Sequence, residues 1–185
     1  MTIKARNRAL FSACRSLLRA LKVTPPLDVR DLVGPIGTLR GRHIERVDYP
    51  LTEELAVTFS LDDCDVVAMR EHTSVWHSDH SLAHELGHLL CGHLDGDDEG
   101  YGSYDAAENA DIARIVAQFG EGRRPRGGVR RRLCYDTPQE QAVEFIATTF
   151  LEWSIVPGRA PLHLPGETGP ASALYRALSY QRGWM

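Results

Sequence analysis

The sequence predicts an α+β fold in which a small antiparallel sheet of about three strands packs on helices. Apolar residues recur at helical spacing before residue 23 and again from about residue 79. Between residues 43 and 69 the period changes, and three short runs have sequence typical of strands. The 185 residues, of which 43% are hydrophobic and 25% charged, fit one globular domain. We therefore expect residues 1–185 to form a single domain.

The composition argues against several classes of protein. The formal net charge of −4 is unlike that of a chain that coats nucleic acid or an anionic membrane. No apolar run approaches the roughly 18 residues needed to span a bilayer, and basic residues interrupt the N-terminal segment where a signal peptide is apolar. The four cysteines form no CxxC pair, so reduced thiols are expected. These features predict a cytoplasmic protein with no membrane partner.

The chain is expected to begin with helices. Residues 5–22 have helical spacing with a basic outer face, and Pro25 and Pro26 end this helix. Asp28 is a suitable N-cap for a second, short helix. Its expected buried residues are Val29, Leu32 and Val33.

Three strands are expected next, over residues 43–48, 54–60 and 64–69. The last two are separated by Leu61–Asp63, a loop of hairpin length. This short connection predicts a mostly antiparallel sheet.

Helices return from about residue 79. A helix over residues 79–91 has Ser78 as a possible N-cap, and Gly92 is suited to end it. Further helices are expected over residues 105–119, about 138–153 and about 171–181.

Residues 95–136 are expected to be a polar, partly mobile insertion around the helix 105–119. An acidic cluster lies over residues 95–99, and six arginines lie between Arg123 and Arg132. Clustered arginines can bind phosphates, but no aromatic residue lies among them. A solvated loop is therefore favoured, and a nucleic-acid partner is not expected.

The segment His84-Glu85-Leu86-Gly87-His88 has the pattern HExxH. Residues four apart lie on one face of a helix, so the two imidazoles can bind one Zn²⁺ ion. Glu85 projects to the side, where it can contact a water on the metal and act as a general base. The alternative is a helix with His and Glu on its solvent-exposed face. The capped, amphipathic context favours the metal site.

Other histidines lie near this motif. His80 is one turn before His84, and a solvent-exposed position is favoured for it over a role at the metal. His93 lies after the helix. A longer motif with a third histidine ligand is rejected, because Cys91 and Leu94 occupy the positions that it requires.

A catalytic zinc site needs a third protein ligand and one open position. The helix expected from residue 138 supplies two candidates, Glu140 and Glu144. Thr137 is a plausible N-cap, and Glu140 could simply complete its capping box. Glu140 lies nearer than Glu144 to the apolar side of this helix, and a carboxylate turned toward a core needs a partner. We therefore favour Glu140 as the third ligand, with Glu144 as the alternative.

The motif His84–His88 followed by residues 140–147 resembles the ImmA/IrrE family of zinc metallopeptidases. The family's downstream helix usually reads E-x-x-A-x-x-F-A, and matching Ile146-Ala147 to its final pair places Glu140 at the family's ligand glutamate. Beyond residue 147 the chain departs from the L-L-M-P that often follows in the family. Arginine supplies almost all of the basic charge, a bias typical of a GC-rich actinobacterial or phage source.

The resemblance implies a gluzincin-like (zincin) fold with a small sheet beside the active-site helix. It also implies cleavage of repressor-type transcription factors in phage, mobile-element or stress regulation. The leading hypothesis is a zinc-dependent endopeptidase in which Zn²⁺, held by His84, His88 and Glu140, polarises the scissile carbonyl and activates water. Glu85 takes the proton of that water and passes it to the leaving amine.

An edge strand, 54–60 or 64–69, is expected to pair with the extended backbone of the protein substrate. The candidates for stabilising the oxyanion are Tyr101, Tyr104, Tyr135 and His80. The second hypothesis is a catalytically inactive module, a regulator or toxin type, that keeps the zincin scaffold and acts by protein binding. The altered end of the helix 138–153 and the polar insertion favour it.

Overall fold

The computed structural model describes residues 3–94, 110–120, 126–130 and 137–155, and these form an α+β fold. The helices are α1 (Ile3–Ala20), the 3₁₀ helix η1 (Val29–Leu32), α2 (Val33–Arg40), α3 (Val75–Leu90), α4 (Ala110–Gln118) and α5 (Pro138–Ile155). The strands are β1 (His43–Tyr49), β2 (Ala56–Ser60), β3 (Cys64–Arg70) and β4 (Arg126–Arg130). The helix expected over residues 171–181 lies outside the described residues.

The sheet has the order β1-β3-β2-β4 and is mixed rather than antiparallel. The predicted hairpin of β2 and β3 is confirmed, with Phe59 opposite Val66. The expectation of an antiparallel sheet is wrong for β1, which pairs with β3 in parallel register. β1, β2 and β3 alternate in direction along the chain, but β1 lies beside β3 instead of β2. The segment between β1 and β2 therefore crosses the sheet, and loop lengths alone do not show this.

β4 lies in a stretch for which the sequence predicts a loop. It pairs antiparallel with β2, where Thr58 lies opposite Arg130 and Ser60 opposite Arg126. This strand contains Arg-Gly-Gly-Val-Arg, and its two glycines give little strand signal. Because β4 covers β2, and β3 lies between β1 and β2, neither of the two strands proposed for substrate pairing is an edge of this sheet. That expectation is wrong.

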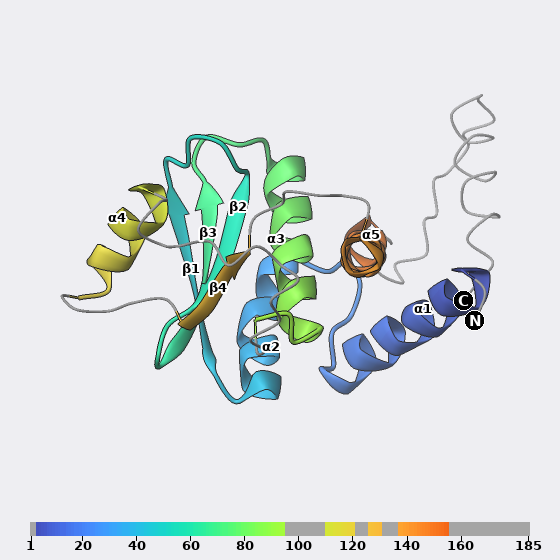
Figure 1. Ribbon diagram of the computed structural model, residues 1–185. Coiled ribbons are helices and arrows are strands. Elements are labelled where there is room, and N and C mark those ends of the chain that lie inside the picture. The colour runs from blue at the N-terminus through green and yellow to red at the C-terminus, as the bar shows by residue number, and fades with distance from the viewer. Residues whose placement is uncertain (1–2, 95–109, 121–125, 131–136, 156–185) are drawn as a thin grey trace, which may run out of the picture.

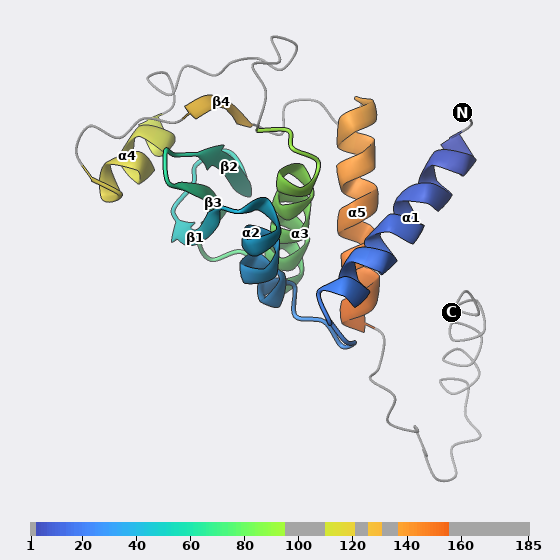
Figure 2. The same ribbon diagram turned by 90° about the horizontal axis from the view of Figure 1, so that it is seen from below.

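Helices cover both faces of the sheet (Figures 1 and 2). α4 lies on one face, where Ile112, Ile115 and Val116 pack against Phe59 and Val66. α2 and α3 lie on the other face, and α5 and then α1 follow beyond α3. α3 therefore lies between the sheet and α5. Residues of β2 and β3 are buried on both faces, which is why their sequences do not alternate between apolar and polar.

Two helix boundaries reflect local capping. Asp28 caps η1 as expected, because its Oδ1 accepts a hydrogen bond of 2.9 Å from the amide of Arg30. α3 begins at Val75, four residues before the expected start, because its N-cap is Ser74 and not Ser78. Val75 and Trp76 are 65% exposed, so the first turn of α3 lacks the apolar side that predicts a helix. Gly92, with φ of 69°, ends α3 as expected.

Asp65 on β3 is fully buried and is bound by two arginines. Its Oδ2 accepts a hydrogen bond from Nε of Arg40 at 2.9 Å, and its Oδ1 accepts one from Nε of Arg42 at 3.0 Å. The hydroxyl of Ser60 donates to the same carboxylate at 2.7 Å. Nη1 of Arg40 also donates to the carbonyl oxygen of Leu89 in the last turn of α3. This network connects the sheet to the C-terminal end of α3.

α3 and α5 approach closely at Gly87. A Cβ atom at this position would lie 3.0 Å from Cγ1 of Val143 and 3.7 Å from Cγ2 of Ile146. The absence of a side chain at Gly87 therefore lets the two helices pack at this distance. The contact lies between His84 and His88 on α3 and one turn after Glu140 on α5, so it sets the separation of those three side chains.

Among the described residues, Cys14, Cys64 and Cys91 form no disulfide, while Cys134 lies outside them. Burial, with a smaller effect of Cys91, raises the pKa of Cys14 to about 11. None of the helices in the described ranges is long and apolar enough to cross a membrane.

Candidate metal centre

α3 places both histidines of the HExxH segment in the interior, facing α5. Leu82, Leu86 and Leu89 anchor α3 in the core of the sheet's inner face. His84 and His88 are 2% and 4% exposed. Their Nε2 atoms lie 3.1 Å apart. Two buried imidazole nitrogens at this distance need a shared proton or a shared cation between them.

The first turn of α5 supplies a carboxylate to this pair. Thr137 is the N-cap that the sequence predicts, because its Oγ1 accepts a hydrogen bond of 3.1 Å from the amide of Glu140. The side chain of Glu140 turns inward, toward the two imidazoles. Its Oε2 lies 3.2 Å from Nε2 of His84, and its Oε1 lies 3.4 Å from Nε2 of His88.

His84, His88 and Glu140 thus form a buried group that could bind a metal ion, with one ligand atom of each within 4.8 Å of the others. Oε2 of Glu140 is buried and makes no hydrogen bond of good geometry with any described residue. A bound cation would satisfy this oxygen. Two imidazoles and one carboxylate are also the ligand set of many catalytic zinc sites. The residues present therefore fit a zinc ion.

The protonation of Glu140 agrees with this role. Burial alone raises the pKa of a carboxylate, but the facing imidazoles of His84 and His88 outweigh it and lower the pKa of Glu140 well below its ordinary value. Glu140 is therefore ionised, which is the form that binds metal.

Glu144, the alternative third ligand, lies on the outer side of the same pair. Its Oε2 is 3.2 Å from Nδ1 of His84, the ring nitrogen that points away from Glu140. Its Oε1 is 2.8 Å from Nε2 of His80. The structure thus brings Glu140 against Nε2 of both histidines and Glu144 against Nδ1 of His84. A carboxylate at that nitrogen fixes the ring and its tautomer.

Two histidines have partners that the sequence did not predict. His80 contacts Glu144 and is only 29% exposed at its side chain, so the expectation of a purely solvent-exposed residue is wrong. Nδ1 of His93 lies 3.0 Å from Nδ1 of His88. His80 and His84 are four residues apart and so lie on one face of α3. This spacing is the sequence signal that could have indicated the contact of His80 with Glu144. His93 follows the helix in a turn, where spacing predicts no partner.

Glu144→Ala is expected to lower zinc affinity about 10- to 100-fold without abolishing zinc binding, because it removes a partner of His84 and not a ligand. Competition against a chromophoric chelator measures this, with Glu152→Ala as a control at an exposed position of α5. Complete loss of zinc in Glu144→Ala would identify Glu144 as a ligand. An unchanged affinity would show that its contact with His84 does not support the site.

Glu85 lies on the other side of His84 and faces the sheet. It is 5% exposed, and its Oε2 accepts a hydrogen bond of 2.6 Å from the hydroxyl of Thr58 on β2. The role of Thr58 cannot be predicted from the sequence, because nothing in a strand sequence indicates which residue faces a helix 27 positions later. This bond fixes the direction of the Glu85 carboxylate.

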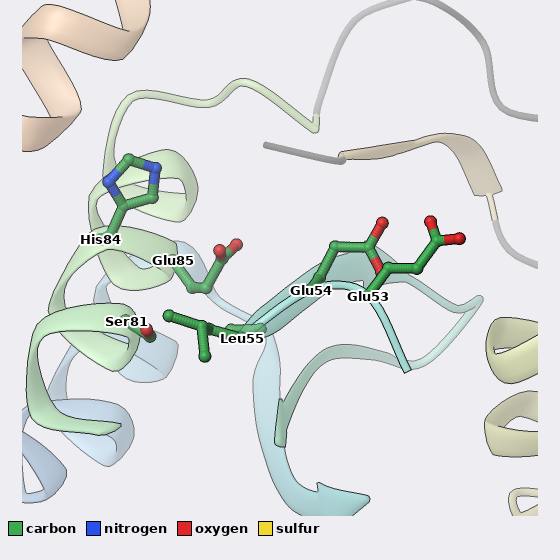
Figure 3. Close-up of a pocket in the computed structure, with 7 residues that line it drawn as sticks. Glu53, Glu54, Leu55, Ser81, His84 and Glu85 are labelled. Atoms are coloured by element: carbon green, nitrogen blue, oxygen red, sulfur yellow. The ribbon is translucent and has the colours of Figure 1, made fainter. Parts of the chain in front are cut away.

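A pocket of about 220 Å³ opens beside Glu85. Its lining comes from α3 and from the segment that leads into β2 (Figure 3). The lining residues are Glu53, Glu54, Leu55, Ala56, Ser81, His84 and Glu85. A molecule bound here would lie next to Glu85 and to His84 of the candidate metal-binding group.

Several predicted features lie outside the described residues. These are the tyrosines considered for the oxyanion, Tyr101, Tyr104 and Tyr135, together with the acidic cluster 95–99. Of the arginine cluster, only the strand 126–130 is described.

Comparison with models of known protein families gives no match, and comparison with curated protein sequences gives none either. The resemblance to the ImmA/IrrE family therefore rests on the HExxH segment and residues 140–147 alone.

Proposed function

We propose that this protein is a zinc-dependent endopeptidase of zincin-like fold that cleaves a regulatory protein such as a repressor. The observation that carries the proposal is the buried convergence of His84, His88 and Glu140 with Glu85 beside them. The class of substrate rests on the resemblance to the ImmA/IrrE family.

The chemistry of the side chains supports hydrolysis. A zinc ion held by His84, His88 and Glu140 would supply a Lewis acid and a water of lowered pKa. In this proposal Glu85 takes a proton from the attacking water and delivers it to the nitrogen of the leaving amine as the peptide C–N bond breaks. The hydrogen bond from Thr58 supports this role, because it fixes the direction of the Glu85 carboxylate.

Metal content is the first test of this proposal. We expect the purified, zinc-loaded protein to hold one zinc per chain by elemental analysis. We expect His84→Ala, His88→Ala and Glu140→Ala each to lose it, because two remaining ligands bind zinc weakly. Loss of a capping role of Glu140 alone would lower the free energy of unfolding by only about 1 kcal/mol.

Circular dichroism shows whether each variant still folds, and Glu152→Ala serves as the matched control on α5. Hydrolysis of an unstructured protein such as casein should stop on chelation and return with zinc. A folded protein that holds no zinc, or that retains zinc in all three variants, would contradict the proposal.

A further inference from the structure

The described lining of the pocket beside Glu85 carries negative charge. Of the seven described residues that line it, three are the glutamates Glu53, Glu54 and Glu85, and none of these seven is lysine or arginine. Glu53 is exposed and Glu54 half-buried at the rim, while Glu85 is buried deeper. Figure 3 shows Glu54 between Glu85 and Glu53, along one wall of the pocket. The negative carboxylates favour a positively charged occupant.

The remaining walls suit an aliphatic stem. Leu55 extends from the β2 side toward α3 (Figure 3), and Ala56 begins β2 beside it. Lysine and arginine side chains combine such a stem with a charged end, so they can cover apolar surface while the end reaches a carboxylate.

A second observation, independent of the charge, indicates that this pocket binds a ligand. Ser81 on α3 lines the pocket and is 3% exposed. Its hydroxyl oxygen is buried and has no hydrogen-bond partner in the described part of the chain. Buried hydroxyls nearly always have a hydrogen-bond partner. A polar group of a molecule in the pocket would supply that partner for Ser81.

We infer that this pocket is the subsite for a lysine or arginine side chain of the substrate, so that cleavage occurs next to a basic residue. The inference rests on the proposed peptidase function, because it assigns the pocket to the residue beside the scissile bond. Its structural basis is that Glu85 and His84 belong to the same pocket as Glu53 and Glu54. A side chain in the pocket therefore places its own backbone near Glu85.

The preference of the pocket for a basic side chain can be tested by the binding of small probes, without any hydrolysis. The probes are N-acetyl-arginine methylamide and N-acetyl-norleucine methylamide, titrated into the zinc-loaded protein and followed by NMR. We expect the arginine probe to bind about tenfold more tightly, a difference of about 1.4 kcal/mol. Glu53→Gln/Glu54→Gln should remove this preference. The control Glu71→Gln/Glu152→Gln changes the same net charge at exposed sites away from the pocket and should keep it.

The positions of the cleavage sites test whether the pocket binds a side chain of the substrate. We expect mass spectrometry of digested casein to find cut sites mainly beside arginine or lysine, and this bias to fall about tenfold in Glu53→Gln/Glu54→Gln. An equal bias in the wild type and in this variant would overturn the inference, as would equal binding of the two probes. If the zinc-loaded protein cuts no substrate but still prefers the arginine probe, the peptidase proposal fails and the cation-binding pocket stands.

Discussion

Replacing Glu85 with glutamine is expected to lower peptide hydrolysis by about 10²- to 10⁴-fold while zinc remains bound, because only proton transfer is lost. Glutamine has nearly the shape of glutamate and can still accept the hydrogen bond from Thr58. The metal-binding group is untouched, since Glu85 is not among its members. Steady-state hydrolysis of a peptide substrate and zinc content of the same sample measure the two halves of this prediction.

Thr58→Val provides a graded comparison for Glu85→Gln. It removes the hydroxyl that orients Glu85 but keeps the carboxylate, so hydrolysis should fall by less than in Glu85→Gln. Zinc content should be that of the wild type in both variants. Unchanged biological function in Glu85→Gln would mean that the protein acts by binding and not by hydrolysis, and loss of zinc would mean that Glu85 itself supports the metal.

Replacing Asp65 with asparagine is expected to lower the free energy of unfolding by about 3–5 kcal/mol, because it leaves two guanidinium groups without their buried counter-charge. Asp65 is fully buried, and the side chain of Arg40 is 8% exposed. The side chain of Arg42 is 23% exposed, so water can solvate its guanidinium group and offset part of the loss in stability. Urea denaturation followed by circular dichroism measures the change.

Asp48→Asn is the matched control for Asp65→Asn. Asp48 also pairs with an arginine in a strand, because its Oδ1 lies 2.6 Å from Nη2 of Arg46, but its side chain is 53% exposed. Exposed ion pairs contribute only about 0–1 kcal/mol. If the two variants lose equal stability, burial is not the source of the effect, and the Asp65 network contributes no more than an exposed ion pair.

Local structure could be predicted from short stretches of sequence. The face shared by His84 and His88 follows from the period of an α-helix, and Thr137 caps α5 because it precedes a proline and an apolar stripe. The hairpin of β2 and β3 follows from its short loop. The inward position of Glu140 could be predicted for the same reason, since it depends on which side of α5 is apolar. Each of these features depends on residues a few positions apart.

Only the tertiary structure decided how these elements meet. It placed β1 beside β3, added β4 to the sheet and directed Thr58 at Glu85. It also placed Glu144 against His84 and His80. Each of these contacts joins residues far apart in the chain. Periodicity shows which side of an element is buried, but the packing of distant side chains, such as Val143 against Gly87, determines what that side contacts.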